Sequence, residues 1–212
     1  MSTLPLLAPG FQLPAFAREM AARQHEATIR WHLEKASEPP PNSILTETVL
    51  DQHRRNFNLW HEEDKARAPQ ATDTQIATVK RNIDKLNQER NDRVEQLDEI
   101  IVNICAHIHI KAGNNARWNT ESPGTAIDRL SILSLKVFHM REQEERKDAT
   151  QEHRAQCQAK RLTLETQRED LSVALQELLD DLFAGRKQMK VYRQFKMYND
   201  PALNPEIYKT KN

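Results

Sequence analysis

Histidine, aspartate and arginine side chains interrupt the apolar faces of several expected helices, and these are the groups of this chain that could transfer protons or bind anions. Burying such groups costs free energy unless they are paired, so their repetition on three helices favours a polar network or a solvated pocket. Proton transfer would then fall to four candidate catalytic residues: His53, Asp64, Asp128 and His139. Arg90 is the candidate anion clamp, because its planar guanidinium binds a carboxylate or phosphate through two hydrogen bonds.

Further polar and aromatic residues on or beside these faces complete the candidate ligand-binding set. They are Asn56, Trp60, His61, Asp84, Asn87 and Asn91, with Lys190 and Arg193 as candidates for the rim of the pocket. The competing interpretation is structural. In that interpretation Arg90 pairs with Asp64 or Asp128, and His53 is a hydrogen-bonded core histidine.

The sequence predicts no metal ligands and no cofactor. None of the eight histidines follows a glutamate by three positions, so the Glu-x-x-His pair of di-iron bundles is absent. His53 and His61 are eight residues apart, about 12 Å along a helix, too far to chelate one ion without a third element. Asp and His ligands from different helices remain the open alternative. No glycine-rich phosphate loop or nucleophile elbow is present.

Composition points to a helical protein without a membrane span. The 212 residues carry 31 basic and 31 acidic side chains, which excludes a strongly basic nucleic-acid coat and an acidic tail protein. Only 4 glycines are present, too few for the tight turns of a many-stranded sheet. The longest apolar run is too short to cross a bilayer. Two cysteines cannot form a disulfide framework, and we expect a cytoplasmic protein.

Proline, glycine and capping residues divide the chain into the helices that carry these side chains. We expect one all-α domain over residues 1–212, an antiparallel bundle of about five long helices plus a short C-terminal helix. The expected helices cover 14–36, 43–67, 72–106, 123–147, 150–184 and 187–198, followed by an extended tail over 199–212. In the third helix an apolar stripe should face the core: Ile76, Val79, Ile83, Leu86, Val94, Leu97, Ile101 and Ile104.

The C-terminal segment is basic and aromatic. From Arg186 onward it holds seven basic and two acidic residues, and aromatic side chains alternate with cations over 190–198. Such interleaving suits single-stranded nucleic acid or a phosphate ligand. The favoured alternative is a helix whose apolar residues dock on the acidic remainder of the chain.

Four long segments carry a resemblance to a known family: LWHEED at 59–64, IDKLNQERND at 83–92, SPGTAIDRLSIL at 122–133 with LKVFHM after it, and KVYRQFKMYNDPALNP at 190–205. In these segments the chain resembles, over nearly its whole length, the bacterial family called Domain of Unknown Function 4254. No characterised reaction comes with that family. The resemblance implies a place beside sugar-transfer genes for surface polysaccharides, which would suit a phosphorylated or nucleotide-linked sugar as ligand.

Three functions therefore compete. The first is a binding protein or metal-independent enzyme for a small anionic metabolite, with Arg90 as clamp. The second is an adaptor or homo-oligomer that docks a protein partner or a second copy of the chain. The third, which the sequence favours least, is nucleic-acid binding through the basic C-terminal segment.

Overall fold

The computed structural model describes residues 5–8, 13–33, 40–195, 197 and 200–209. It is an all-α bundle, as the sequence predicts, with a 3-10 turn at Leu13–Ala15 and two very short strands. The elements are α1 (Phe16–His32), α2 (Ile44–Ala66), α3 (Asp73–His107), β1 (Arg117–Trp118), α4 (Pro123–Glu145), α5 (Gln151–Phe183), β2 (Lys187–Gln188) and α6 (Pro205–Tyr208). None of the helices in the described residues combines the length and apolar composition needed to cross a membrane.

Side-chain caps set the beginnings of the long helices. The Ser43 hydroxyl accepts a hydrogen bond from the Thr46 backbone N–H, which satisfies one unpaired donor of the first turn of α2. Thr72 and Ser122 form capping boxes at the starts of α3 and α4. Thr150 caps α5, so the predicted break between the fourth and fifth helices is confirmed. Gly185 follows α5 with a φ of 69°, the left-handed conformation that ends many helices.

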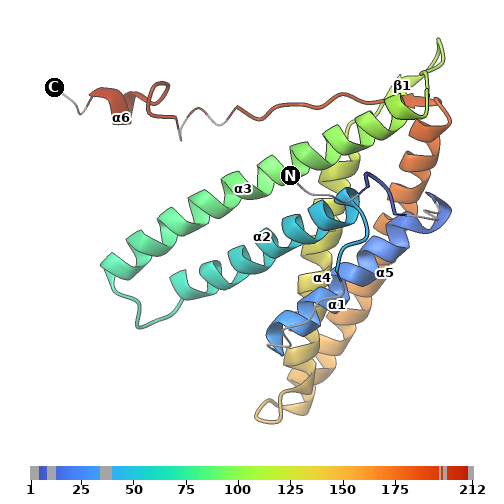
Figure 1. The fold of residues 1–212 in the computed structure, drawn as a ribbon. Coiled ribbons are helices and arrows are strands. Elements are labelled where there is room, and N and C mark those ends of the chain that lie inside the picture. The colour runs from blue at the N-terminus through green and yellow to red at the C-terminus, as the bar shows by residue number, and fades with distance from the viewer. Residues whose placement is uncertain (1–4, 9–12, 34–39, 196, 198–199, 210–212) are drawn as a thin grey trace.

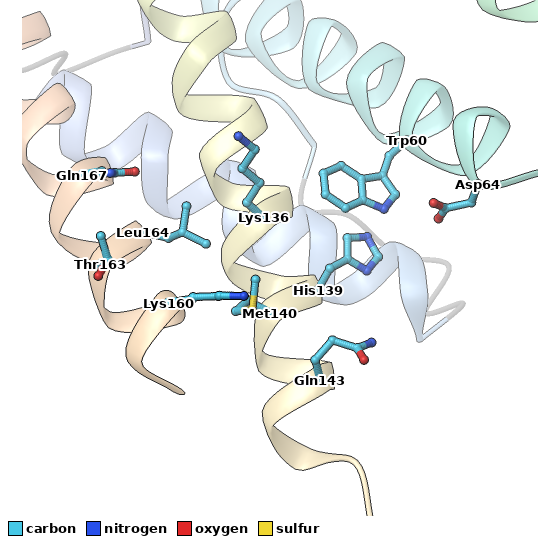
Figure 2. Close-up of a pocket in the computed structure, with 10 residues that line it drawn as sticks. All are labelled: Trp60, Asp64, Lys136, His139, Met140, Gln143, Lys160, Thr163, Leu164 and Gln167. Atoms are coloured by element: carbon cyan, nitrogen blue, oxygen red, sulfur yellow. The ribbon is translucent and has the colours of Figure 1, made fainter. Parts of the chain in front are cut away.

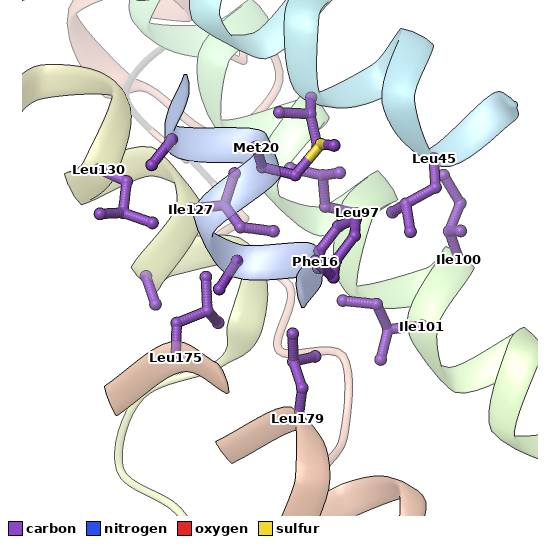
Figure 3. Close-up of a cluster of buried hydrophobic side chains, with 14 of the residues drawn as sticks. Phe16, Met20, Leu45, Leu97, Ile100, Ile101, Ile127, Leu130, Leu175 and Leu179 are labelled. Atoms are coloured by element: carbon purple, nitrogen blue, oxygen red, sulfur yellow. The ribbon is translucent and has the colours of Figure 1, made fainter. Parts of the chain in front are cut away.

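The long helices form two antiparallel hairpins, α2–α3 and α4–α5, and α1 packs against α4 and α5 (Figure 1). The α2–α3 hairpin projects at an angle from the bundle of α1, α4 and α5. Side chains from all five helices meet where the hairpins join (Figure 3). The largest of them are wholly or almost wholly buried: Phe16, Met20, Leu97, Ile101, Ile127, Leu130, Leu175 and Leu179.

The predicted apolar stripe of α3 is buried over most of its length. Its buried residues are Val79, Ile83, Val94, Leu97, Ile101 and Ile104, and Leu86 is half-buried. Ile76 is the exception at 42% exposed, because it lies in the first turn of α3, at the far end of the projecting hairpin (Figure 1).

The predicted helix over 187–198 is wrong. Lys187 and Gln188 instead form β2, which pairs in parallel with β1, and residues 189–195 continue without helix. The Gln188 side-chain amide also donates to the Ala116 carbonyl, and the Gly113 N–H donates to the Gly185 carbonyl at 2.9 Å. Contacts with this distant loop outweigh the local helical preference. Two further bounds differ from prediction: α1 ends at His32, with 34–36 outside the described residues, and the tail contains α6.

Candidate functional site

Asp128 on α4 is the centre of a polar network between three helices. Its carboxylate accepts hydrogen bonds from Arg90 Nε at 2.8 Å and from Arg90 Nη2, so the two side chains form a bidentate ion pair. Gln52 and Asn56 on α2 also donate to Oδ1, Asn56 at 2.9 Å. Of the two partners that the sequence leaves open for Arg90, Asp128 is therefore the one used. The pair joins α3 to α4 and satisfies a charge that is almost completely buried.

His53 lies in a chain of hydrogen bonds that fixes its protonation. The Thr28 hydroxyl donates to the Gln24 carbonyl, so it must accept from His53 Nε2–H, 2.9 Å away. The other ring nitrogen, Nδ1, then accepts from the Ser131 hydroxyl at 2.7 Å, and Ser131 accepts in turn from Asn56. His53 is 0% exposed, and burial lowers its pKa to about 3. Both ring nitrogens are occupied and the ring is neutral, which indicates a structural histidine.

A cavity of about 660 Å³ lies between α4, α5 and the second half of α2 (Figure 2). Trp60 on α2 stacks on the ring of His139 at 4.6 Å between centroids, and the two form one wall. Met140 and Leu164 supply the apolar floor. The polar and charged lining residues are Asp64, Lys136, Gln143, Lys160, Thr163 and Gln167. The volume and the mixed lining are typical of a site for a small molecule.

A second cavity, of about 310 Å³, shares Trp60 and Asp64 with the first. Asn56 and Arg90 line it, together with the Glu63 and Arg67 side chains at its edge. Arg67 is paired with Glu63 at 2.7 Å. Both arginines that line the second cavity are therefore neutralised by neighbouring carboxylates, Arg90 by Asp128 and Arg67 by Glu63. Five of the predicted site residues line one or both of the two cavities: Asn56, Trp60, Asp64, Arg90 and His139.

His32, His61 and His139 form the cluster in the described residues that could hold a metal ion. One ring nitrogen of each lies within 4.8 Å of the corresponding nitrogens of the other two. Burial, followed by the repulsion of neighbouring histidines, lowers the pKa of His61. Burial also lowers the pKa of His139, although its hydrogen bond to Glu142 opposes the shift. Both rings are thereby favoured in the neutral form, which is the form that binds metals.

The remaining predicted residues lie elsewhere. Asp84 pairs with Lys80 on the surface of α3, and Asn87 and Asn91 are half-buried on the same helix. Arg193 pairs with Glu95 and Glu99 of α3, which holds the C-terminal segment against that helix. The Lys190 ammonium lies 4.7 Å from the centre of the Trp118 ring. These five residues therefore surround neither cavity.

Sequence reasoning missed several residues that the structure brings to the network, the cavities or the cluster: Thr28, His32, Gln52, Ser131, Lys136 and Lys160. One signal was present for Lys136, which is the single lysine or arginine in the mostly apolar stretch 130–140. His32 gave no such signal. The rotation of α1 relative to α2 and α4 cannot be read from the pattern of α1 alone.

Fold and site together define an all-α protein with a ligand-sized cavity between the α4–α5 hairpin and the second half of α2. Residues 46–191 match the family described as Protein of unknown function (DUF4254), and the chain belongs to that family. The expected resemblance is thus confirmed, although most of the segment 190–205 falls outside the matched range. No curated protein and no solved structure gave a match.

Proposed function

We propose that the protein binds a small anionic metabolite, such as a phosphorylated or nucleotide-linked sugar, in the cavity between α2, α4 and α5. The observation that carries this proposal is the charge of the lining. The lining contains two lysines, Lys136 and Lys160, and one carboxylate, Asp64, so its net charge is positive and attracts an anion. Trp60 offers a flat apolar surface against which a sugar ring or a base would stack.

This assignment moves the anion-binding role from Arg90 to the two lysines. Arg90 commits Nε and Nη2 to Asp128, whose carboxylate neutralises the guanidinium. Lys136 and Lys160 are exposed and form no hydrogen bond or ion pair with another described residue. Asp64 and His139 lie in the same lining and are the residues placed to move a proton, should the bound metabolite react.

The test is a thermal-shift screen of the full chain with inorganic phosphate, sugar phosphates, nucleotide sugars and nucleotides. A ligand present at about 100 times its dissociation constant stabilises a fold by about 2.7 kcal/mol, which raises the melting temperature of a chain of this size by several degrees. We expect such a shift for a phosphorylated sugar compound. In the double variant Lys136→Gln/Lys160→Gln the shift should disappear while the ligand-free melting temperature stays unchanged.

The matched control is Lys147→Gln, which removes an exposed lysine from the loop between α4 and α5, outside the cavity lining. This variant should keep the full ligand-induced shift. A screen without any stabilising anion, or equal shifts in the double variant and the wild type, would contradict the proposal.

A second candidate function, an adaptor or homo-oligomer, has one observation in its favour. The C-terminal segment exposes large apolar side chains, among them Tyr192 at 69% and Phe195 at 81%. If the segment joins two copies, light scattering should give the mass of a dimer for the full chain and the mass of a monomer for a chain that lacks residues 190–212.

Both cysteines are free, which suits the reducing cytoplasm that we propose as the location of the protein.

A further inference from the structure

We propose that His32, His61 and His139 bind one divalent transition-metal ion of the zinc type. The three residues come from three different helices, α1, α2 and α4, and meet at the edge of the cavity lined by His139. The sequence predicts no metal because the Glu-x-x-His pair is absent and His53 and His61 are too far apart on one helix, but it leaves open ligands that come from different helices. In the cluster each of three helices contributes a single histidine, so no two ligands need to lie close together in the sequence.

The hydrogen bonds of two of the rings leave the right nitrogen for a metal. His32 Nδ1 lies 2.8 Å from the Thr28 carbonyl oxygen, which can only accept, so Nδ1 carries the proton. His139 Nδ1 lies 2.7 Å from a Glu142 carboxylate oxygen and donates to it in the same way. In both rings the lone pair is therefore on Nε2. Metal-binding histidines are held in this manner, with the second nitrogen donating to a carbonyl or carboxylate.

The Nε2 atoms of His32 and His139 are both buried and have no hydrogen-bond partner among the described residues. A buried polar atom without a partner costs free energy, and most such atoms in proteins are satisfied. An ion bound between the rings would satisfy both atoms at once. Two buried nitrogens without partners, on two rings of one cluster, are thus the second observation that points to a ligand.

Aromatic rings surround the cluster. His32 stacks on Phe138 with 4.1 Å between ring centroids, and Trp60 stacks on His139. Phe57 contacts the rings of His32 and His61 at their edges. These ring contacts hold the three imidazoles in place.

The geometry requires little rearrangement. Nitrogens bound to one tetrahedral zinc ion lie about 3.3 Å apart, given bonds of about 2.0–2.1 Å. The observed limit of 4.8 Å is therefore closed by small rotations of the side chains. Three protein ligands leave a fourth position for water or an anionic group. His139 belongs to both cluster and cavity, so the cluster lies at the edge of the cavity.

Metal binding is measured on the full chain without an affinity tag, after treatment with a chelator. The probes are Zn²⁺ in equilibrium dialysis with elemental analysis, and Co²⁺ followed by its visible absorption. We expect one ion per chain and the intense absorption bands of four-coordinate Co²⁺. His61→Ala and His139→Ala should each lower the affinity by more than about 100-fold. His107→Ala, which removes an exposed histidine at the end of α3, should change nothing.

Glu142→Gln gives a second readout that does not remove a ligand. It weakens the hydrogen bond that orients His139 and should lower Zn²⁺ affinity about tenfold while the helical circular dichroism spectrum stays the same. Failure of the wild-type chain to retain Zn²⁺ or Co²⁺ would overturn the proposal, as would unchanged affinity in folded His61 and His139 variants. If His61→Ala fails to fold, His61→Asn takes its place.

This inference goes beyond the proposed metabolite site and can fail independently of it. The double variant Lys136→Gln/Lys160→Gln should keep its Zn²⁺ affinity. His61→Ala removes a ligand that does not line the metabolite cavity. Loss of metal without loss of the phosphate-dependent shift, or the reverse, shows which of the two sites is absent.

Discussion

Arg90 and Asp128 show how one ion pair can satisfy a core position at which either residue alone would be destabilising. Asp128 is 7% exposed and receives four hydrogen bonds, two of them from Arg90. Arg90→Leu leaves that carboxylate without its charge partner. We expect a loss of about 2–3 kcal/mol in the free energy of unfolding, measured by urea denaturation, since the pair is mostly but not completely buried.

A double-mutant cycle separates the pair from its surroundings. Asp128→Asn alone should also destabilise, and the double variant Arg90→Leu/Asp128→Asn should lose less than the sum of the two, with a coupling of about 1–3 kcal/mol. Additive losses would mean that the ion pair does not carry the effect.

His53 makes stability depend on pH in the acidic range. Its pKa of about 3 in the folded chain is far below the value of 6.5 expected when unfolded. Between these values the unfolded chain binds a proton that the folded chain does not, so stability falls as pH decreases from 6.5 toward 3. This residue should lower the free energy of unfolding by about 2 kcal/mol between pH about 7.5 and about 5.

Urea denaturation of the wild type and of His53→Gln at several pH values checks this expectation. Carboxylates titrate in both proteins, so the difference between the two slopes isolates the histidine. The variant should be less stable at neutral pH because it loses the ring's contacts, and it should be less sensitive to acid. Parallel pH profiles would show that folding does not change the pKa of His53, and would contradict the expectation.

Among the elements, the contact between α3 and α4 depends on a glycine. A Cβ at Gly124 would lie 2.5 Å from the Val94 carbonyl oxygen and 2.9 Å from an Asp98 carboxylate oxygen. The Gly124 N–H also donates to Asp98 at 2.7 Å, which orients the first turn of α4. Gly124→Ala should destabilise the chain by about 1–3 kcal/mol, seen as a lower melting temperature.

Gly113→Ala is the matched control for that change. Its Cβ would meet the Gly185 carbonyl oxygen at 3.6 Å, an ordinary contact, and its φ is not in the left-handed region. The melting temperature should stay within about a degree of the wild type. Equal effects of the two substitutions would exclude close helix approach as the cause.

The helices were predictable because their ends are encoded locally. Thr72, Ser122 and Thr150 cap the helices that the sequence places after them, and a capping residue acts within one turn of chain. The short strand at Lys187–Gln188 was not predictable in this way. Its partner, Arg117–Trp118, lies about 70 positions earlier, and no local pattern in 187–198 records that contact.

For the candidate site, the sequence predicted which faces of the helices carry the polar residues, and it did not predict how those faces meet. The polar intrusions on α2 and α4 do meet, as His53 and Asn56 contact Ser131 and Asp128. Which intrusion becomes a core network and which reaches a cavity depends on the crossing of the helices. A helical pattern gives the direction of a side chain around its own axis, and the position along the neighbouring helix is left open.

For the molecule as a whole, the projecting α2–α3 hairpin should make the beginning of α3 locally less stable than its second half. Near Ile76 the helix α3 is packed on one side by α2 and is otherwise exposed, whereas Leu97 and Ile101 lie in the shared core. Amides of 73–83 should therefore exchange hydrogen through local opening, faster than those of 97–104, which require global unfolding. Hydrogen exchange with mass spectrometry measures both segments in one experiment. Equal protection along α3 would contradict this division.

The three tryptophans lie in three different parts of the molecule. Trp31 stacks on His53 in the polar core, Trp60 stacks on His139 at the cavity, and Trp118 lies beneath Lys190 of the C-terminal segment. Replacing two of them with phenylalanine leaves one intrinsic fluorophore for each region. The emission of Trp60 alone would then report events at the cavity, Trp31 the integrity of the core, and Trp118 release of the C-terminal segment, with no label added to the chain.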